Sequence, residues 1–313
     1  MRPPCTTTLA RTPRGEPRFS SRNAQLRREA RGTLRSFSIG GTTRVSELRI
    51  EDSKWTNLAF ARVGDVLRVE IAHPTNPMNV VDGEMHDDLA RLFRELKRER
   101  TARAVLITGR GKFFSAGGDF NWFPTLQDPA NLELTRRDGK QLVWDLLDVE
   151  LPIVAAVNGA AVGLGASIAL LCDVIFMADS AQIADPHVRV GVVAGDGGAA
   201  IWPLLLGPAR AKQYLMTGDA VKAPEAERIG LVNRVVPAAE LEAEAMKFAQ
   251  RLAAGAPLAV QFTKQSVNKL VKDALNTAFD TSMALEMLTF RSEDHREALA
   301  AIREKRAPHF RGR

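Results

Sequence analysis

The chain of 313 residues has few cysteines and no long apolar run, and both absences narrow its class. Its two cysteines, Cys5 and Cys172, cannot build a disulfide framework or a cysteine metal cluster. No apolar run approaches the roughly 18–20 residues that a membrane helix needs. We therefore expect no membrane partner, and a reducing compartment such as the cytoplasm fits the scarcity of cysteine.

Several common site motifs are also missing from the sequence. It has no G-x-x-x-x-G-K-[ST] phosphate loop and no G-x-S-x-G nucleophile elbow. The glycines of residues 163–168 lack the third glycine of a dinucleotide fingerprint. The five histidines show no metal-ligand spacing. We therefore expect no metal site and no nucleotide cofactor.

Acidic residues are scarce in residues 1–44, which hold ten Arg, no Lys and two Glu. This segment carries a net charge of +8 against +6 for the whole chain, which leaves −2 for the remainder. Nucleic-acid binding by the folded part is therefore disfavoured. We expect residues 1–45 to be a disordered Arg-rich extension. A transit peptide, which would direct the protein to the mitochondrial matrix, and a mis-assigned start codon are alternative interpretations.

From about residue 46 onward, short apolar runs alternate with segments of helical periodicity, a pattern that argues for an α/β fold. The sequence predicts strands at 66–71, 104–108, 152–157, 174–177 and 231–236. It predicts helices at 80–99, 140–149, 239–254, 257–272 and 274–306, the last two separated at Asp273. We divide this part into a core over 46–250 and a helical region over 251–313. The apolar stripe of that region is either core or an oligomer contact, and its members are Leu275, Phe279, Met283, Met287 and Phe290.

Two glycine-rich turns, 113–120 and 157–167, each follow an apolar run that is typical of a buried strand. Such turns can direct main-chain N–H groups at an oxyanion, although they can also serve only tight strand–helix packing. In the segment 184–198, His187 and Asp196 stand nine residues apart among apolar residues and glycines. An imidazole and a carboxylate so placed are candidates for proton transfer. A loop histidine and a helix N-cap are the alternative interpretations.

The motifs that carry a family resemblance are spread over about 260 residues, at 114–119, 152–165, 172–173, 186–198, 215–219, 226–236 and 304–306. In these segments the chain resembles the enoyl-CoA hydratase/isomerase (crotonase) superfamily. The resemblance implies a crotonase-like spiral of ββα units with a C-terminal helical region that assembles into homotrimers or homohexamers. It also implies an acyl-CoA substrate, in which coenzyme A is part of the substrate and no separate cofactor is needed.

The resemblance assigns roles to residues of the two glycine-rich turns. It implies that the N–H groups of Ala116 and Leu164 form the oxyanion hole. Hydratases of this family carry two catalytic glutamates, and the matching positions here hold Ser167 and His187. We expect His187 and Asp196 to replace that pair, with Ser167 as a third candidate catalytic residue.

Further residues are candidates for contact with the substrate. Pro77 and Met78 match the family segment that lies along coenzyme A. Asp119 is expected to cap the following turn, while nearby aromatic side chains line an acyl pocket or belong to the core. The candidates for substrate and coenzyme A binding are Pro77, Met78, Asp119, Phe120, Trp122, Lys264, Lys305 and Arg306.

Three hypotheses for function follow. The first is a lyase of the enoyl-CoA hydratase/isomerase type that stabilises a thioester enolate. The second is a hydrolase that cleaves a C–C bond of a β-diketone in a retro-Claisen reaction, with His187 and Asp196 as its dyad. The third is a non-catalytic RNA-binding relative, suggested by the basic residues 1–44.

Overall fold

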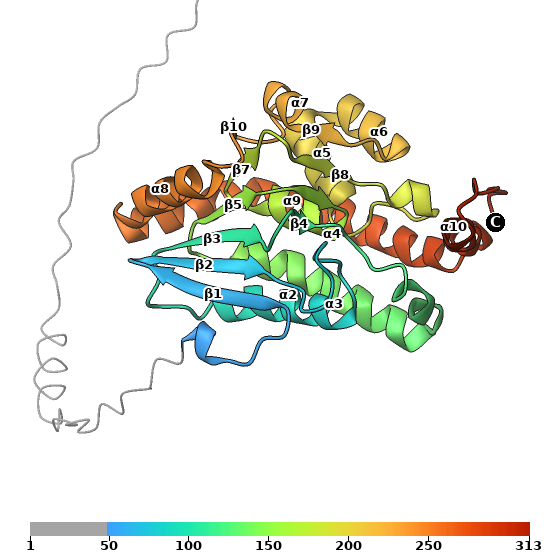
Figure 1. The fold of residues 1–313 in the computed structure, drawn as a ribbon, viewed down its shortest axis with the longest axis horizontal. Coiled ribbons are helices and arrows are strands. Elements are labelled where there is room, and N and C mark those ends of the chain that lie inside the picture. Colours follow the sequence, from blue (N-terminus) through green and yellow to red (C-terminus); the bar gives the residue numbers. More distant parts are fainter. Residues whose placement is uncertain (1–48) are drawn as a thin grey trace, which may run out of the picture. The chain divides into compact units, whose positions relative to one another are not determined.

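Two sheets organise the part of the chain that the computed structural model describes, residues 49–313 (Figure 1). The extension expected over 1–45 lies outside these residues. The larger sheet has six strands in the order β1-β2-β3-β5-β7-β10. Its strands are β1 (Leu58–Val63), β2 (Val66–Ile71), β3 (Ala104–Gly109), β5 (Ile153–Val157), β7 (Val174–Ala178) and β10 (Arg234–Val236). Only β1 pairs antiparallel, with β2, and the remaining pairs are parallel.

The smaller sheet has the strand order β4-β6-β8-β9. Its strands are β4 (Phe113–Ser115), β6 (Ala160–Val162), β8 (Gln182–Ala184) and β9 (Val221–Lys222). Each of β4, β6 and β8 follows directly on a strand of the larger sheet and leads toward a helix. This recurring strand–strand–helix order is the ββα spiral that the resemblance implied. Because β4, β6 and β8 are mutually parallel, the turns that follow them meet at one edge.

Nine α-helices surround these sheets in residues 49–313. They are α2 (Gly83–Leu96), α3 (Pro129–Asp148), α4 (Leu164–Leu171), α5 (Gly198–Leu206), α6 (Pro208–Thr217), α7 (Ala223–Arg228), α8 (Leu241–Ala253), α9 (Pro257–Phe290) and α10 (Glu293–Glu304). Short 3₁₀ helices occupy η1 (Ile50–Asp52), η2 (Phe123–Gln127) and η3 (His187–Val190). No described helix has both the length and the apolar character to cross a membrane.

The sequence predicted most of these elements, but four boundaries were wrong. The helix predicted over 274–306 is interrupted, because α9 ends at Phe290 and Ser292 caps a new helix, α10, that begins at Glu293. Helix α3 begins at Pro129 rather than at residue 140, because Asp128 caps its N-terminus with bonds to two main-chain N–H groups. Strand β10 begins at Arg234 rather than at 231. The predicted break at Asp273 is also wrong, since α9 runs unbroken from Pro257 to Phe290. An Asp inside a helix costs only a few tenths of a kcal/mol, roughly 0.7 at most, which packing readily offsets.

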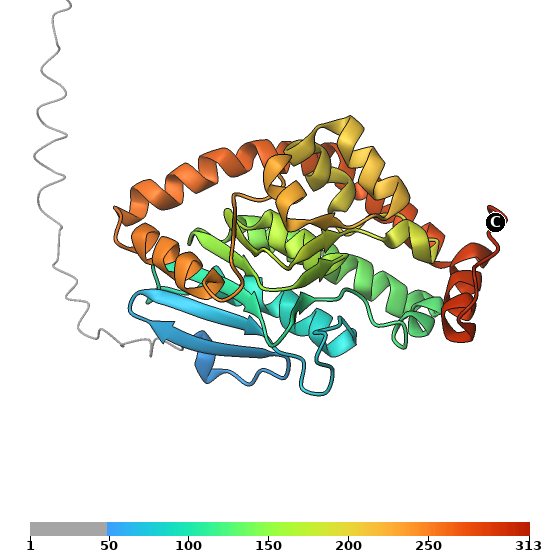
Figure 2. The same ribbon diagram turned by 45° about the horizontal axis from the view of Figure 1, so that its top comes forward.

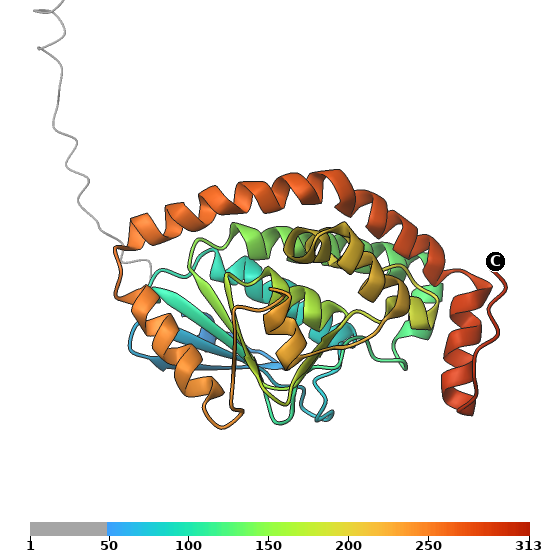
Figure 3. The same cartoon turned by 90° about the horizontal axis from the view of Figure 1, so that it is seen from above.

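Helix α9 runs along the side of the fold away from the β1–β2 hairpin (Figures 2 and 3). For the apolar stripe of the C-terminal helical region, the sequence allowed two interpretations, core and oligomer contact. The stripe belongs to the core, since Leu275, Phe279, Met283 and Phe290 are buried and Met287 is partly buried. Met283, Met287 and Phe290 also line a pocket of the fold.

Candidate active site

The turns after β4, β6 and β8 contact one another and form the floor of a pocket. Gly117 has a φ of +81° and lies so close to Val162 that a β-carbon would meet the Val162 carbonyl oxygen at 2.9 Å. Gly163 has a φ of +54°, and a β-carbon there would lie 3.4 Å from the His187 ring. Glycine adopts this left-handed conformation without the steric penalty that a side chain brings. At this edge of the smaller sheet, the turn after β4 therefore packs against the end of β6. The turn after β6 packs against the ring of His187, which belongs to the turn after β8.

The main-chain donors of the pocket differ in part from the predicted pair. The prediction for Ala116 is wrong, because its N–H donates to the Met78 carbonyl at 3.0 Å and is not free for a ligand. Two residues further on, the Gly118 N–H has no hydrogen-bond partner within residues 49–313. Leu164 begins α4, so its N–H has no carbonyl of the same helix to bond. Gly118 and Leu164 both line the pocket, and their amides are its available donors.

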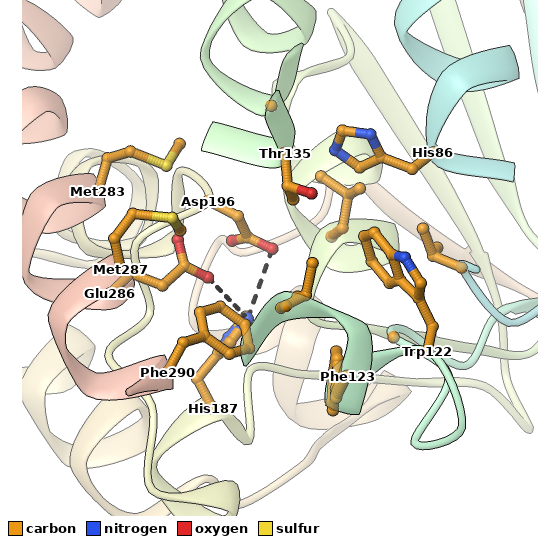
Figure 4. A pocket seen from close by; sticks show the side chains of 15 residues that line it. His86, Trp122, Phe123, Thr135, His187, Asp196, Met283, Glu286, Met287 and Phe290 are labelled. Atoms are coloured by element: carbon orange, nitrogen blue, oxygen red, sulfur yellow. Dashed lines mark ion pairs between the residues drawn. The ribbon is translucent and has the colours of Figure 1, made fainter. Parts of the chain in front are cut away.

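Three acidic side chains surround the imidazole of His187, and Figure 4 shows two of them, Asp196 and Glu286. Asp185, two residues earlier in the same turn, binds Nδ1 directly. On the opposite ring edge, Nε2 lies 3.6 Å from Oδ2 of Asp196 and 3.8 Å from Oε1 of Glu286. Asp185 rather than Asp196 therefore orients the ring, and Nε2 faces the pocket together with two acids.

The charges of this cluster shift the protons that its members hold. Burial alone would lower the pKa of His187, but the carboxylates of Asp185 and Asp196 raise it well above its ordinary value. Burial raises the pKa of Asp196, and His187 partly opposes that shift. Burial, with Asp196 and Asp185 as further causes, raises the pKa of Glu286 well above its ordinary value. The directions of these pKa shifts favour a proton on His187 and a proton on Glu286.

Ser167 supports the cluster from the buried side of α4. Its hydroxyl donates to Oδ1 of Asp196 at 3.0 Å. This bond leaves Oδ2 of Asp196 free to face His187. The serine that stands where the resemblance expects a glutamate therefore orients the carboxylate beside it.

Asp185, His187 and Asp196 also carry atoms of the kinds that ligate metal ions. One ligand atom each of Asp185, His187 and Asp196 lies within 4.8 Å of the others. Asp185 is engaged with Nδ1, however, so an ion in the pocket would meet only Nε2 and the facing acids. These groups equally suit proton exchange without a metal.

The remaining wall of the pocket is mostly apolar. Trp122 lines it as predicted, while Phe120 is largely exposed and borders a second hollow outside. Asp119 closes the turn after β4, where its Oδ1 accepts from the N–H of Asn121. The apolar lining residues are Val81, Phe123, Leu126, Met283, Met287 and Phe290.

Sequence reasoning missed three polar residues of the pocket, Glu286, His86 and Thr135. Glu286 is the only acid at helical spacing inside the apolar stripe from Met283 to Phe290, and that interruption was a usable signal. His86 lies on the buried face of α2, where nothing in the sequence pattern distinguishes it from a structural histidine.

The predicted cations have different surroundings. The prediction for Lys264 as a phosphate ligand is wrong: this lysine is buried and its Nζ lies 2.8 Å from both the Leu151 carbonyl and Asp173. Arg306 is exposed and pairs with Glu297 and Glu304. Lys305 directly follows α10 as its C-cap, and the phosphate-binding roles of Lys305 and Arg306 remain predictions.

Pro77 and Met78 lie exposed beside the pocket floor, since the Met78 carbonyl accepts from the Ala116 N–H. Their contact with coenzyme A remains a prediction.

Comparison with known proteins gives the class of this site. The family model described as "Enoyl-CoA hydratase/isomerase" matches residues 62–313. The chain therefore belongs to the enoyl-CoA hydratase/isomerase family, and it is an enzyme of that type with the crotonase fold.

Individual relatives include both hydratases and a hydrolase. A crotonyl-CoA hydratase of Syntrophomonas wolfei is 38% identical over 239 residues, which cover 74% of this chain and 90% of that protein. The crystal structure of an enoyl-CoA hydratase/isomerase from Mycobacterium paratuberculosis is 38% identical in sequence and has a TM-score of 0.74. The match covers 78% of this chain and 98% of that chain. The structure of a β-diketone hydrolase from Anabaena, bound to (S)-3-oxocyclohexyl acetic acid, is 30% identical in sequence and has a TM-score of 0.73. The match covers 78% of this chain and 97% of that chain.

Proposed function

We propose that this enzyme adds water to, or removes it from, an acyl-CoA thioester through an enolate. The observation that carries the proposal is one pocket that brings together two free main-chain donors, of Gly118 and Leu164, and the His187–Asp196 pair. Preorganised donors of this kind stabilise the negative oxygen of an enolate. Coenzyme A belongs to the substrate, and the proposal requires no further cofactor.

The proposed proton balance takes Asp196 as a carboxylate and His187 as an imidazolium. Asp196 takes a proton from water as the water oxygen bonds to the β-carbon of an α,β-unsaturated thioester. The electron pair of the double bond moves to the thioester oxygen, where the two amides hold it. His187 then donates its proton to the α-carbon and restores the carbonyl. The proton held by Asp196 passes to Nε2 of His187, 3.6 Å from Oδ2, and returns both groups to their starting states. This division of roles replaces the two glutamates that typical hydratases of the family carry.

A second candidate function is the hydrolysis of a β-diketone. It is favoured by the acid-flanked His187 in place of those glutamates and by the likeness to the Anabaena hydrolase. In this reaction water attacks one carbonyl and gives its proton to Asp196. The C–C bond breaks, and its electron pair forms the enolate of the other carbonyl at Gly118 and Leu164. Protonation by His187 yields a ketone and a carboxylic acid.

An assay of two substrate classes separates the candidates. Wild type should hydrate crotonyl-CoA or a longer enoyl-CoA, and His187→Ala should lower kcat by about 10²–10⁴-fold. His309→Ala, which alters an exposed histidine, serves as the matched control. No turnover of any enoyl-CoA would refute the hydratase proposal. Cleavage of a cyclic β-diketone that depends on His187 would establish the second candidate instead.

Nothing in residues 49–313 favours the RNA-binding alternative, which rested on the basic residues 1–44.

Assembly into a trimer or hexamer is also part of our proposal. It is supported by large apolar side chains that α9 leaves exposed in the isolated chain: Leu258, Phe262, Val267, Leu270, Leu285 and Leu288. Light scattering of the purified protein tests this, and a monomeric mass at micromolar concentration would contradict it.

A further inference from the structure

The pocket also contains His86, which lies apart from the cluster of His187, Asp196 and Glu286. His86 comes from α2 and is 5% exposed, with its ring 5.7 Å from that of Trp122. Figure 4 shows it across the pocket from Glu286 and His187. Among charged groups, only Asp138 affects the pKa of His86, so the acids around His187 are too distant to act on it.

The ring of His86 has no hydrogen-bond partner within the described residues, although it lines the pocket. Burial lowers its pKa, so the imidazole is neutral at pH 7. A neutral imidazole offers one N–H donor and one acceptor nitrogen. A ligand that fills the pocket excludes water from this ring, and a ring nitrogen that is then left without a partner costs free energy.

The neighbouring helix leaves room for such a ligand. Gly139 of α3 also lines the pocket, and a β-carbon there would lie 3.6 Å from Nε2 of His86. The surrounding side chains of Met283 and Leu126 are apolar. Thr135 also lines the pocket (Figure 4), but its hydroxyl already donates to the Asn131 carbonyl at 2.9 Å. A ligand oxygen that accepts a hydrogen bond would therefore find its donor in His86 rather than in Thr135.

We propose that His86 is a specificity-determining residue that binds an oxygen on the acyl part of the substrate, remote from the carbonyl held by Gly118 and Leu164. The preferred substrate class is thus an acyl group that carries a keto or hydroxyl oxygen along its chain or ring, rather than a plain hydrocarbon. This inference rests on the proposed function for the identity of the reacting end, because an acyl group must occupy the pocket.

Binding of matched ligands tests the proposal without turnover. Calorimetry on the full chain compares hexanoyl-CoA, which has no double bond to hydrate, with its 4-oxo and 5-oxo derivatives. Wild type should bind at least one oxo ligand about two- to tenfold more tightly than hexanoyl-CoA, as expected for one added neutral hydrogen bond. His86→Leu should abolish this preference, and His86→Gln should retain part of it. Gly139→Ala, which places a methyl group 3.6 Å from Nε2 and keeps the imidazole, should reduce this preference because the methyl group occupies space beside that nitrogen.

The outcomes separate this proposal from the proposed function. A preference that survives in His86→Leu, or no preference in wild type, overturns the role of His86. If no thioester binds, the acyl-CoA function fails, and NMR of ¹⁵N-labelled histidine with free acids decides about His86. A shift of its ring nitrogens with 3-oxocyclohexylacetic acid but not with cyclohexylacetic acid supports the proposal. Equal shifts, or none, overturn it.

Discussion

The oxyanion hole can be tested by removing one N–H group while the helix that carries it is kept. Leu164 is the first residue of α4, a position where proline is tolerated because its N–H makes no bond within the helix. Proline restricts the residue before it, but that residue is Gly163, which has no β-carbon to clash. Leu164→Pro therefore deletes the proposed donor with little change to the backbone.

The magnitude follows from the role of the donor. Loss of one oxyanion donor typically lowers kcat by about 10²–10³-fold, or about 2.7–4 kcal/mol. The Leu164 side chain is itself buried, so its loss also destabilises the fold by about 2–5 kcal/mol. Leu164→Ala shares that loss of packing and keeps the N–H, which makes it the matched control.

The assay compares kcat of the two variants on whichever substrate the wild type turns over, with folding checked by thermal unfolding. We expect Leu164→Pro to fall about 10²-fold or more below Leu164→Ala, with similar unfolding temperatures. A folded Leu164→Pro protein that is as active as Leu164→Ala would refute the assignment of this amide as a donor.

The remaining predictions concern the acid cluster. Because Asp196 must be ionised and His187 protonated, kcat/KM should follow a bell-shaped pH profile. Its acid limb should lie above the usual range of aspartate, and its alkaline limb above the usual range of histidine, as the directions of both pKa shifts require. Asp196→Asn should lower kcat by at least about 10²-fold, and activity near that of wild type would exclude Asp196 as the base. Glu286→Gln should retain kcat within about tenfold, since a neutral amide replaces a protonated acid; a loss as large as that of Asp196→Asn would mean that ionised Glu286 is needed. Ser167→Ala removes a bond to a charged acceptor, worth about 1.5–3 kcal/mol, and should move the acid limb to higher pH. A profile unchanged in Ser167→Ala would show that the hydroxyl does not stabilise the carboxylate.

The sequence predicted well those features that depend on neighbours along the chain. The parallel strands β3, β5 and β7 appear as continuous apolar runs because both of their faces are buried. His187 and Leu164 lie in turns whose glycines and family motifs could be recognised without coordinates. The predicted register of the oxyanion loop was wrong by two residues: the Ala116 N–H donates to the Met78 carbonyl, and the free donor of this loop is the N–H of Gly118.

Other features of the site depend on contacts between distant segments. Glu286 stands 99 positions after His187 along the chain, and only the path of α9 past η3 brings its carboxylate to Nε2. His86 reaches the same pocket from α2. The burial and pairing of Lys264 could not be predicted either, because its partners lie far from it in the sequence. Asp173, its ion-pair partner, follows α4, and Leu151, whose carbonyl accepts from its Nζ, precedes β5. Such residues cannot be identified from local pattern alone.

The charges of the cluster explain why a histidine can work where the family uses a glutamate. Asp185, Asp196 and Glu286 would together place three negative charges in a buried space, and burial strongly disfavours that state. The raised pKa values of Glu286 and His187 favour a proton on each, and these protons relieve the repulsion. The charged group that faces the developing enolate is then an imidazolium rather than a carboxylate. Coulomb attraction adds to the two amide donors as the oxygen becomes negative, and Asp185 on Nδ1 keeps that positive charge in place before the substrate arrives.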